Sequence, residues 1–292
     1  TASSEAAVPS SAAASSPAST AASPATPTGG AAAAAALLPQ EFRDKGFIGV
    51  ASDIPYPPME ILNDDGSISG LDYDLSQALG EVLGIEVQFN KQAWDSIIPS
   101  LKAGRHDVIW SGMNDTLERE KTLDFVNYFR GGMAIMVKKG NPEGITTLLD
   151  LCGKTVAVQT STVQGDLVTA ASKDCPSGEI TVIELPTDAD AQNAVRAGKA
   201  TADVLDAAVA AYAAQTAGDG QYFEVIIDPA NPEGYSPIFT GVGILKEDSG
   251  LTAAVQAGLQ ELLDNGTYQQ ILDKYDLGAY GVQSIVINGA TQ

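Results

Sequence analysis

Histidine, cysteine and basic residues are scarce in this 292-residue sequence. It contains one histidine, two cysteines, and 16 Lys and Arg against 37 Asp and Glu, which gives a net charge of −21. A nucleic-acid-binding surface needs clustered Lys and Arg, so this composition excludes a nucleic-acid partner. Two cysteines and one distant histidine, His106, are too few for a zinc site. We therefore expect no metal, no cofactor and no nucleic acid.

Long hydrophobic runs are also absent. The sequence has no stretch of roughly 18 or more strongly apolar residues, so it predicts no membrane-spanning helix. Residues 1–36 are almost wholly Ala, Ser, Thr, Pro and Gly and offer little apolar surface to offset the entropy of ordering. We expect them to form a disordered tether, with a short helix favoured only in the alanine run at 31–36. The chain begins at Thr1 rather than Met, which indicates a processed product.

The two cysteines, Cys152 and Cys175, flank what the sequence predicts to be one strand and one helix. Two interpretations fit them. They form a disulfide, which implies an oxidising, exported location, or they are two buried reduced thiols. The tether-like composition of residues 1–36 favours an exported protein, and therefore the disulfide.

From Phe47 onward, short strand patterns alternate with amphipathic helix patterns. Such alternation predicts an open α/β sheet with helices on both faces. The first set comprises strands at 47–51, 85–89 and 107–110, and helices at 73–83 and near 97–101.

After residue 140 the same pattern restarts, which predicts a second lobe of similar construction. It comprises strands at 154–159, 179–185 and 202–206, and helices near 163–172 and 188–197. A strand at 241–246 and two final helices then return to the first lobe. We therefore assign 37–131 plus 240–292 to lobe I and 132–239 to lobe II. Ligands of open α/β sheets bind beyond the carboxyl ends of the strands, so the site is expected in the cleft between the lobes.

Polar and aromatic residues follow the predicted strands at the ends that face this cleft. Their types indicate a ligand with one negative and one positive group, between flat apolar walls. The candidate ligand-binding residues are Asp53, Tyr56, Trp94, Ser111, Gly112, Met113, Asn114, Arg119, Thr160, Thr162 and Asp206.

Arg119, Thr162 and a helix amino terminus suit an α-carboxylate, while Asp206 suits an α-ammonium. An amino acid meets both requirements. Each assignment has an alternative: Arg119 as a solvated surface residue, Asp206 as a helix N-cap, Asp53 as a turn cap, and the two aromatic residues as core or surface side chains.

Five motifs in this order resemble the extracellular solute-binding proteins of family 3, which are receptors for polar amino acids in ATP-driven importers. The resemblance covers essentially everything from about residue 38 onward. The motifs are GLDYDLSQALGEVLG (70–84), WDSIIPSLKAGRHDVIWSGM (94–113), the Thr-x-x-Arg element at 116–119, GKTVAVQTST (153–162) and LDNGTYQQILDKY (263–275).

This resemblance implies a type II periplasmic-binding-protein-like clamp that closes on one amino acid and delivers it to a membrane permease of an ABC importer. It implies Tyr56 and Trp94 as walls, Arg119 and Thr162 at the carboxylate, and Asp206 at the ammonium. In this family an acidic residue at the position of Asp53 often faces a basic or amide side chain of the ligand, and Trp94 can stack on a guanidinium. The resemblance therefore favours arginine, lysine, histidine or glutamine as the ligand. The sequence departs from the family pattern at Asn114, Ser161 and Val163.

The resemblance further implies an extracytoplasmic protein, either lipid-anchored at the cell surface as in Gram-positive relatives or periplasmic. Two other functions share the scaffold. One is a dehydratase-type enzyme, for which Glu60 is the nearest general acid, although we expect Glu60 to be exposed. The other is a sensory ligand-binding domain, which normally continues into a transmembrane helix.

Overall fold

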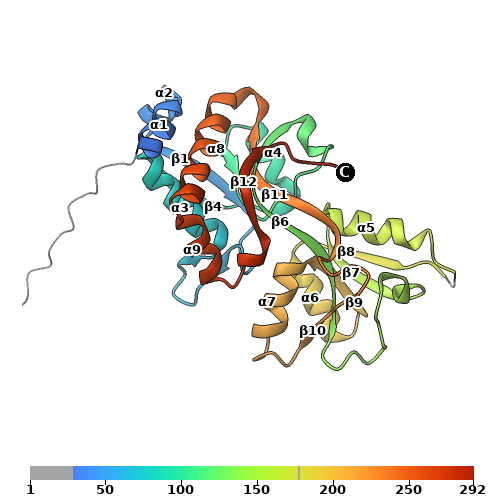
Figure 1. Ribbon diagram of the computed structural model, residues 1–292. Helices are drawn as coiled ribbons and strands as arrows, with labels where there is room; N and C mark the ends of the chain where they lie inside the picture. The colour runs from blue at the N-terminus through green and yellow to red at the C-terminus, as the bar shows by residue number, and fades with distance from the viewer. Residues whose placement is uncertain (1–28, 177) are drawn as a thin grey trace, which may run out of the picture.

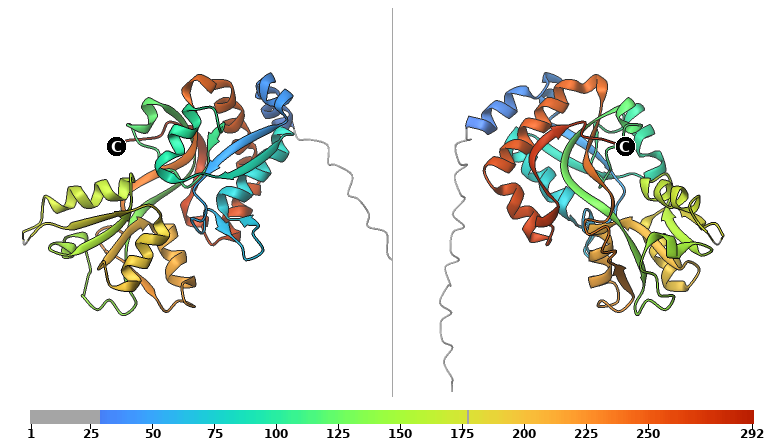
Figure 2. Two further views of the ribbon diagram at one scale, coloured as in Figure 1. Left: turned by 180° about the vertical axis from the view of Figure 1, so that it is seen from behind. Right: turned by 45° about the vertical axis from the view of Figure 1, so that its right-hand side comes forward.

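The computed structural model describes residues 29–176 and 178–292, which form two lobes joined by two long strands (Figure 1). Views from two other sides show the same separation (Figure 2). The predicted fold, a two-lobed α/β clamp with helices on both faces of each sheet, is confirmed. Within the described ranges, no helix is long and apolar enough to cross a membrane.

Lobe I has a sheet between two helical layers. Successive residues of β1 face opposite layers: Val50 packs in the apolar cluster with α3 and α8, and Ala51 packs in the cluster with α4. A strand covered on both faces needs consecutive apolar residues, which explains the sequence FIGVA. The elements are α1 (Gly29–Leu37), α2 (Gln40–Lys45), β1 (Phe47–Ser52), β2 (Ile61–Leu62), β3 (Ile68–Ser69), α3 (Leu71–Leu83), β4 (Glu86–Lys91), α4 (Ile97–Lys102), β5 (Val108–Ile109), α8 (Ser249–Asp264), α9 (Thr267–Lys274) and β12 (Gly281–Ile287).

Lobe II repeats this arrangement with α5 on one face of its sheet and α6 and α7 on the other. In β7, Val156 and Val158 join the apolar cluster with α5, while Ala157 faces the opposite cluster. The elements are β7 (Thr155–Gln159), α5 (Val163–Ser172), β8 (Thr181–Leu185), α6 (Asp188–Ala197), β9 (Ala202–Asp206), α7 (Ala207–Thr216) and β10 (Phe223–Ile226).

Strands β6 (Leu123–Lys138) and β11 (Tyr235–Leu245) belong to both lobes. The strand order β4-β1-β5-β11-β6-β9-β7-β8 places this antiparallel pair at the centre of one continuous sheet. The expected lobe boundaries at 131/132 and 239/240 lie inside these two strands, and the division at those residues stays a prediction.

The predicted tether of residues 1–36 falls mostly outside the described residues. Residues 29–36 are not disordered, and the short helix expected in the alanine run at 31–36 is present: they form α1, which packs on α3 and α8 and buries Ala34. Alanine has the highest helix propensity. The guanidinium of Arg43 also donates to the carbonyl oxygens of Ala36 and Leu38, both at 2.9 Å. It thereby provides hydrogen-bond donors for carbonyl groups at the carboxyl end of the helix.

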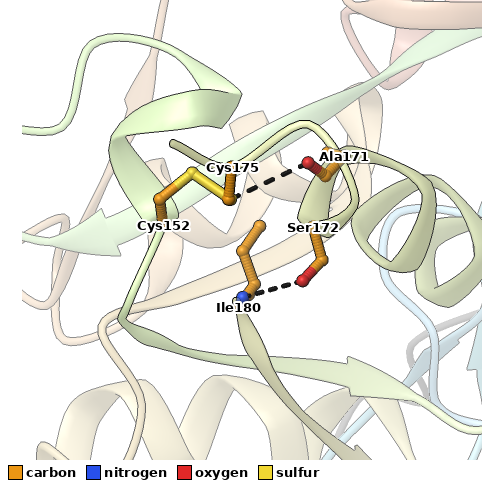
Figure 3. Close-up of a disulfide and its surroundings, with 5 residues drawn as sticks. All are labelled: Cys152, Ala171, Ser172, Cys175 and Ile180. Atoms are coloured by element: carbon orange, nitrogen blue, oxygen red, sulfur yellow. Dashed lines mark hydrogen bonds between the residues drawn. A yellow bond between two sulfur atoms is a disulfide. The ribbon is translucent and has the colours of Figure 1, made fainter. Parts of the chain in front are cut away.

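The predicted disulfide between Cys152 and Cys175 is confirmed (Figure 3). It joins the residue after the short helix Leu148–Leu151 to the segment after α5, with a Cα–Cα distance of 5.5 Å. Nearby, the Ser172 hydroxyl accepts a hydrogen bond of 2.8 Å from the amide of Ile180. The carboxyl end of α5 is thereby fixed to lobe II, while its amino end faces the cleft.

A buried carboxylate explains the first motif, GLDYDL. Asp72, in the first turn of α3, accepts 2.7 Å from the amide of Gly112 and 2.6 Å from the hydroxyl of Tyr128. Burial raises the pKa of Asp72 to about 6. Because Gly112 follows β5, Asp72 fixes the loop that leads from this strand toward the cleft.

Glu60 is fully buried next to Asp72, so the expectation that it is exposed is wrong. Its Oε1 accepts 3.0 Å from the Ser52 hydroxyl, and Oε2 has no hydrogen-bond partner among the described residues. Burial, and then the negative charge of Asp72, raise the pKa of Glu60 well above its usual value. We expect Glu60 to carry a proton at neutral pH, because two adjacent carboxylates cannot both ionise there.

Removing the disulfide is expected to lower the free energy of unfolding. A loop closed over 23 residues corresponds to about 3 kcal/mol of unfolded-state entropy. We expect urea unfolding of the double variant Cys152→Ser/Cys175→Ser to show a loss of about this size. As a control, reductant should destabilise the wild type similarly and leave the variant unchanged. A loss confined to the reduced wild type would contradict the explanation.

Glu60→Gln is expected to stabilise the protein at high pH. The glutamine side chain keeps an acceptor for the Ser52 hydroxyl and cannot place a negative charge next to Asp72. When the pKa of a carboxyl group is higher in the folded state than in the unfolded state, the protein becomes less stable as the pH rises above the unfolded-state pKa. For Glu60 that unfolded-state pKa is near 4.5. We expect a gain of about 1–3 kcal/mol at about pH 8 and much less at about pH 5, measured by urea unfolding. An equal gain at both pH values would show that Glu60 does not retain a proton in the folded protein.

Candidate functional site

Arg119 lies in the cleft between the lobes, at the start of the short helix Arg119–Lys121. Its Nη1 donates 2.7 Å to the carbonyl of Asn114, and its Nη2 donates 3.3 Å to the carbonyl of Ser161 in lobe II. The guanidinium carbon lies 5.4 Å from the centre of the Trp94 ring. Burial lowers the pKa of Arg119 to about 10, so the group stays charged at neutral pH. The lobes therefore present one fixed cation at this end of the cleft.

Asp206 occupies the N-cap position of α7, but its side chain makes no capping hydrogen bond. Its Oδ2 accepts 2.6 Å from the Tyr56 hydroxyl and its Oδ1 accepts 3.4 Å from Nδ2 of Asn114, both from lobe I. Burial raises the pKa of Asp206. The side chain is thus directed across the cleft rather than toward its own helix.

Asp53 makes a further contact between the lobes. Its Oδ2 accepts 2.7 Å from Nε2 of Gln159, the last residue of β7, which also donates 3.2 Å to the carbonyl of Pro186. The Asp53 amide donates 2.8 Å to the Ser111 hydroxyl. Gln159 was not among the predicted site residues, although it ends a strand that faces the cleft.

The segment 111–114 shapes the lobe I side of the site. Gly112 has φ +55°, and a Cβ there would lie 3.0 Å from Cε1 of Tyr56, so glycine allows the ring to pack on the backbone. The Met113 side chain is buried in the cluster with α4, and its carbonyl accepts 3.0 Å from the amide of Gly241. The Met113 side chain therefore belongs to the core of lobe I, and its carbonyl is paired with β11.

On the lobe II side, Thr162 caps helix α5. Its hydroxyl accepts 3.4 Å from the Gly165 amide and donates 2.7 Å to the carbonyl of Gln159. Thr160 points elsewhere, since its hydroxyl donates 3.0 Å to Glu184 on β8. The structure therefore places the amino end of α5, but not the Thr160 hydroxyl, toward Arg119.

Two buried acidic residues in lobe II were also missed. Asp188 is the first residue of α6, and Asp203 lies within β9. Burial raises the pKa of Asp188 to about 7 and raises that of Asp203 well above its usual value. The position of Asp188 after β8 was a usable signal, because this strand also ends at the cleft. Asp203 carried none, because a strand interior is not expected to hold a carboxyl group.

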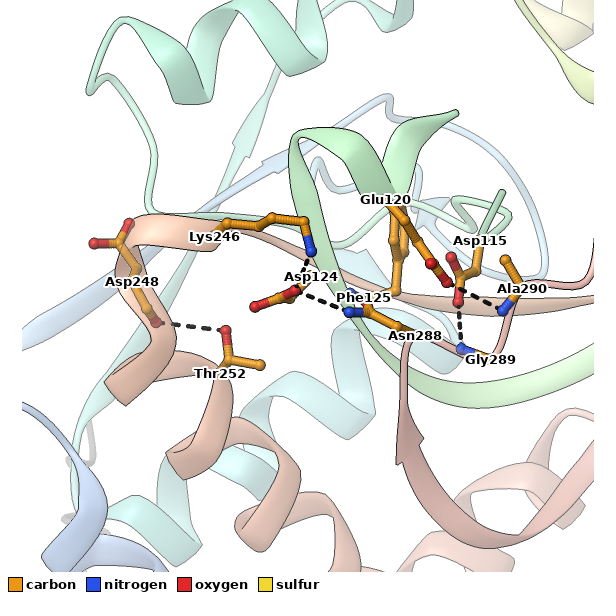
Figure 4. A network of polar contacts seen from close by, with 10 residues as sticks. All are labelled: Asp115, Glu120, Asp124, Phe125, Lys246, Asp248, Thr252, Asn288, Gly289 and Ala290. Atoms are coloured by element: carbon orange, nitrogen blue, oxygen red, sulfur yellow. Dashed lines mark hydrogen bonds and ion pairs between the residues drawn. The ribbon is translucent and has the colours of Figure 1, made fainter. Parts of the chain in front are cut away.

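The loop 115–120, which carries Arg119, is held by the end of the chain (Figure 4). Oδ2 of Asp115 accepts 2.9 Å from the Gly289 amide, and Glu120 accepts 3.1 Å from the Ala290 amide. The amide of Leu117 donates 2.9 Å to the carbonyl of Gln292. These hydrogen bonds between residues 289–292 and the loop were not predicted from the sequence.

A cavity of about 570 Å³ lies between this loop and α5. Arg119, Thr162, Asp166 and Gln292 border it. On the described part of the chain, no group of three or more His, Cys, Asp or Glu is arranged to hold a metal ion.

A family model of the bacterial extracellular solute-binding proteins, family 3, matches residues 48–279. The chain is 31% identical over 259 residues to the arginine-binding protein ArgT of Corynebacterium glutamicum, covering 86% of this chain and 81% of ArgT.

Two solved structures are similar at a TM-score of 0.71. One is the ancestral amino acid-binding protein AncCDT-1, a precursor of cyclohexadienyl dehydratase, at 33% identity over 81% of this chain and 98% of its own. The other is an ancestral arginine-binding protein bound to arginine, at 32% identity over 79% of this chain and 98% of its own. The family match spans most of the sequence, and the chain belongs to the bacterial extracellular solute-binding proteins of family 3.

Proposed function

We propose that this protein captures a polar or basic L-amino acid in its interlobe cleft and delivers it to the permease of an ABC importer. One observation supports this most directly: Asn114 contacts both a cation and an anion. Its backbone carbonyl accepts from Arg119, and its side-chain Nδ2 donates to Asp206. An α-amino acid carries a carboxylate and an ammonium on the same carbon, so one ligand can meet both charges.

Within this proposal Arg119 and the amino end of α5, capped by Thr162, bind the α-carboxylate, and Asp206 binds the α-ammonium. Tyr56 and Trp94 form the walls, and segment 111–114 supplies backbone contacts. Residues from both lobes contribute, so the ligand gains its full set of contacts only when the lobes are together. Binding then shifts the population toward the closed form, which the permease recognises.

The proposed location is extracytoplasmic, either periplasmic or at the cell surface through an N-terminal lipid anchor. The disulfide supports an oxidising compartment. Arginine is the favoured ligand, because ArgT and the ancestral arginine-binding protein are named for it and because Asp53 adds a carboxylate to the cleft.

A dehydratase function has support from the resemblance to AncCDT-1, a precursor of such an enzyme. It requires a general acid that reaches the substrate. Glu60 is fully buried beside Ser52 and Asp72, so it is poorly placed for this role. We therefore propose a binding protein rather than an enzyme. Turnover of a cyclohexadienyl or amino-acid-like substrate by purified protein would reverse this choice.

The first test is a thermal-shift panel of the twenty amino acids followed by calorimetry. A ligand at about a thousand times its Kd should add roughly 4 kcal/mol of stability. Arg119→Lys keeps the charge but loses bidentate geometry and should weaken binding at least ~10-fold, and Arg119→Ala roughly 100-fold or more. Arg105→Lys, at an exposed position, is the matched control. Unchanged affinity in both Arg119 variants would refute the carboxylate assignment.

Asp53→Ala tests ligand selectivity. Loss of this carboxylate should weaken arginine binding by about 10-fold or more and glutamine binding by less, because only arginine carries a positive side chain. Asp95→Ala removes an exposed charge that acts on Asp53 and should leave both affinities nearly unchanged. If Asp53→Ala changes neither affinity, Asp53 is not a specificity residue. Competition calorimetry with both ligands measures the effect.

A further inference from the structure

The loop 115–120 is covered by residues 288–292, which follow β12 and which we call the strap (Figure 4). Three backbone groups of the strap, at residues 289, 290 and 292, form hydrogen bonds with the loop. Because these bonds follow one another along both segments, the strap fixes the loop along most of its length. Arg119, the cation of the proposed site, lies inside the fixed stretch.

The strap begins at a fixed point on β6. Asn288 has φ +56°, and its side chain bonds to the strand through both of its polar atoms. Oδ1 accepts 2.8 Å from the amide of Phe125, and Nδ2 donates 2.9 Å to Asp124. Asp124 also accepts 2.7 Å from Nζ of Lys246 on the other side. The strap is therefore anchored to the sheet of lobe I before it reaches the loop.

Asp115 fastens the loop to the strap from inside the protein. It is fully buried, and its Oδ2 accepts 2.9 Å from the Gly289 amide and 3.0 Å from Nδ2 of Asn127 on β6. Its own amide donates 2.8 Å to the carbonyl of Phe239 on β11. A buried hydrogen-bonded network of this kind fixes one geometry more narrowly than apolar packing does. Asp115 therefore ties the residue after Asn114 to both shared strands.

Gly289 allows this contact because it has no side chain. A Cβ there would lie 2.7 Å from Oδ1 of Asn127 and 2.9 Å from Cδ2 of Phe239. Its amide lies close enough to donate a second hydrogen bond, of 2.9 Å, to that same Oδ1. Substitution by alanine would therefore push the strap away from Asp115 and leave the Arg119 side chain itself unaltered.

These contacts act on Arg119 by two routes. Along the chain, strap bonds at Leu117 and Glu120 enclose Arg119 on both sides. Through the side chain, the guanidinium donates 2.7 Å to the carbonyl of Asn114, the residue that precedes Asp115. The strap thus holds both the backbone that carries Arg119 and the acceptor that orients its guanidinium.

We infer that the strap, fastened at Asp115 and Gly289, is a positioning element that holds the Arg119 guanidinium in the orientation needed to bind the α-carboxylate of the ligand. A bidentate contact between arginine and a carboxylate requires two aligned hydrogen bonds, and an arginine on a free loop would lose conformational entropy on binding. Asp115 and Gly289 act through Arg119 and do not border the cavity beside it. The inference rests on the proposed function, because it concerns the same carboxylate-binding group.

The test measures recognition of the α-carboxylate by calorimetry with L-arginine and L-argininamide, in which an amide replaces the carboxylate. The wild type should prefer arginine by at least ~30-fold, and Gly289→Ala should reduce this preference to about 5-fold or less. Argininamide affinity should change by less than about 3-fold, because this ligand has no carboxylate for Arg119 to bind. If the thermal-shift panel identifies another amino acid, that amino acid and its α-carboxamide take the place of this pair.

Gly258→Ala is the matched control. A Cβ at Gly258 would lie 2.3 Å from Cδ1 of Leu79, so this variant disturbs the packing between α3 and α8 instead of the strap. It should lower stability and keep the wild-type preference for arginine. A change in preference is therefore separable from a general loss of stability.

Asp115 supplies a second pair of variants. Asp115→Ala removes the acceptor for the Gly289 amide, whereas Asp115→Asn keeps an oxygen that can accept in its place. Asp115→Ala should reduce the preference for arginine as Gly289→Ala does, and Asp115→Asn should stay within about 3-fold of the wild type. This rescue by the conservative variant assigns the effect to the hydrogen bond with the strap.

Hydrogen exchange gives an independent readout in the free protein. If the strap orders the loop, the amides of residues 115–120 should exchange at least ~10-fold faster in Gly289→Ala than in the wild type or in Gly258→Ala.

The inference is overturned if either Gly289→Ala or Asp115→Ala keeps the wild-type preference or weakens the two ligands equally. It is also overturned if Asp115→Asn loses the preference as fully as Asp115→Ala, if loop exchange is unchanged in Gly289→Ala, or if the wild type binds arginine and argininamide equally. Failure of the proposed function differs from all of these, because then the wild type binds no amino acid.

Discussion

The buried carboxylate of Asp72 is the interaction on which the site depends. By accepting from the amide of Gly112, it fixes the backbone after β5, where Tyr56 packs against that glycine. Two residues further on, the carbonyl of Asn114 accepts a hydrogen bond from Arg119, and its side-chain Nδ2 donates one to Asp206. The proton that we assign to Glu60 is part of the same constraint, because a second buried negative charge next to Asp72 would oppose it.

Charge in the cleft is strongly unbalanced, and this imbalance favours the binding of a cation. Asp53 and Asp206 make contacts across it from opposite lobes, while Arg119 lies at one end. Burial raises the pKa of both carboxyl groups, so the folded protein holds them at a cost in free energy. A zwitterion with a neutral side chain would balance Arg119 and one aspartate. A basic side chain would also offset the second.

Most strands and helices were predictable from the sequence, because each buries apolar residues at its own period. The helices predicted at 163–172 and 188–197 match α5 and α6. The full length of β6 was not predictable, since its second half belongs to another lobe. Strand β12 and the support of loop 115–120 by residues 288–292 depend on contacts remote in sequence.

The shared strands explain how ligand contacts can act on the arrangement of the whole molecule. At Gly132 a Cβ would lie 2.3 Å from the carbonyl oxygen of Glu233, and the pairing of β6 with β11 is irregular between Tyr235 and Ile238. A second irregularity lies between Thr240 and Gly241, so we expect bending to concentrate in this stretch of the shared strands. The side chains that reach from lobe I to lobe II include those of Asp53, Tyr56, Trp94, Asn114 and Arg119. Because all five are also proposed ligand contacts, binding and closure would use the same groups, and a ligand that satisfies them would favour the closed form.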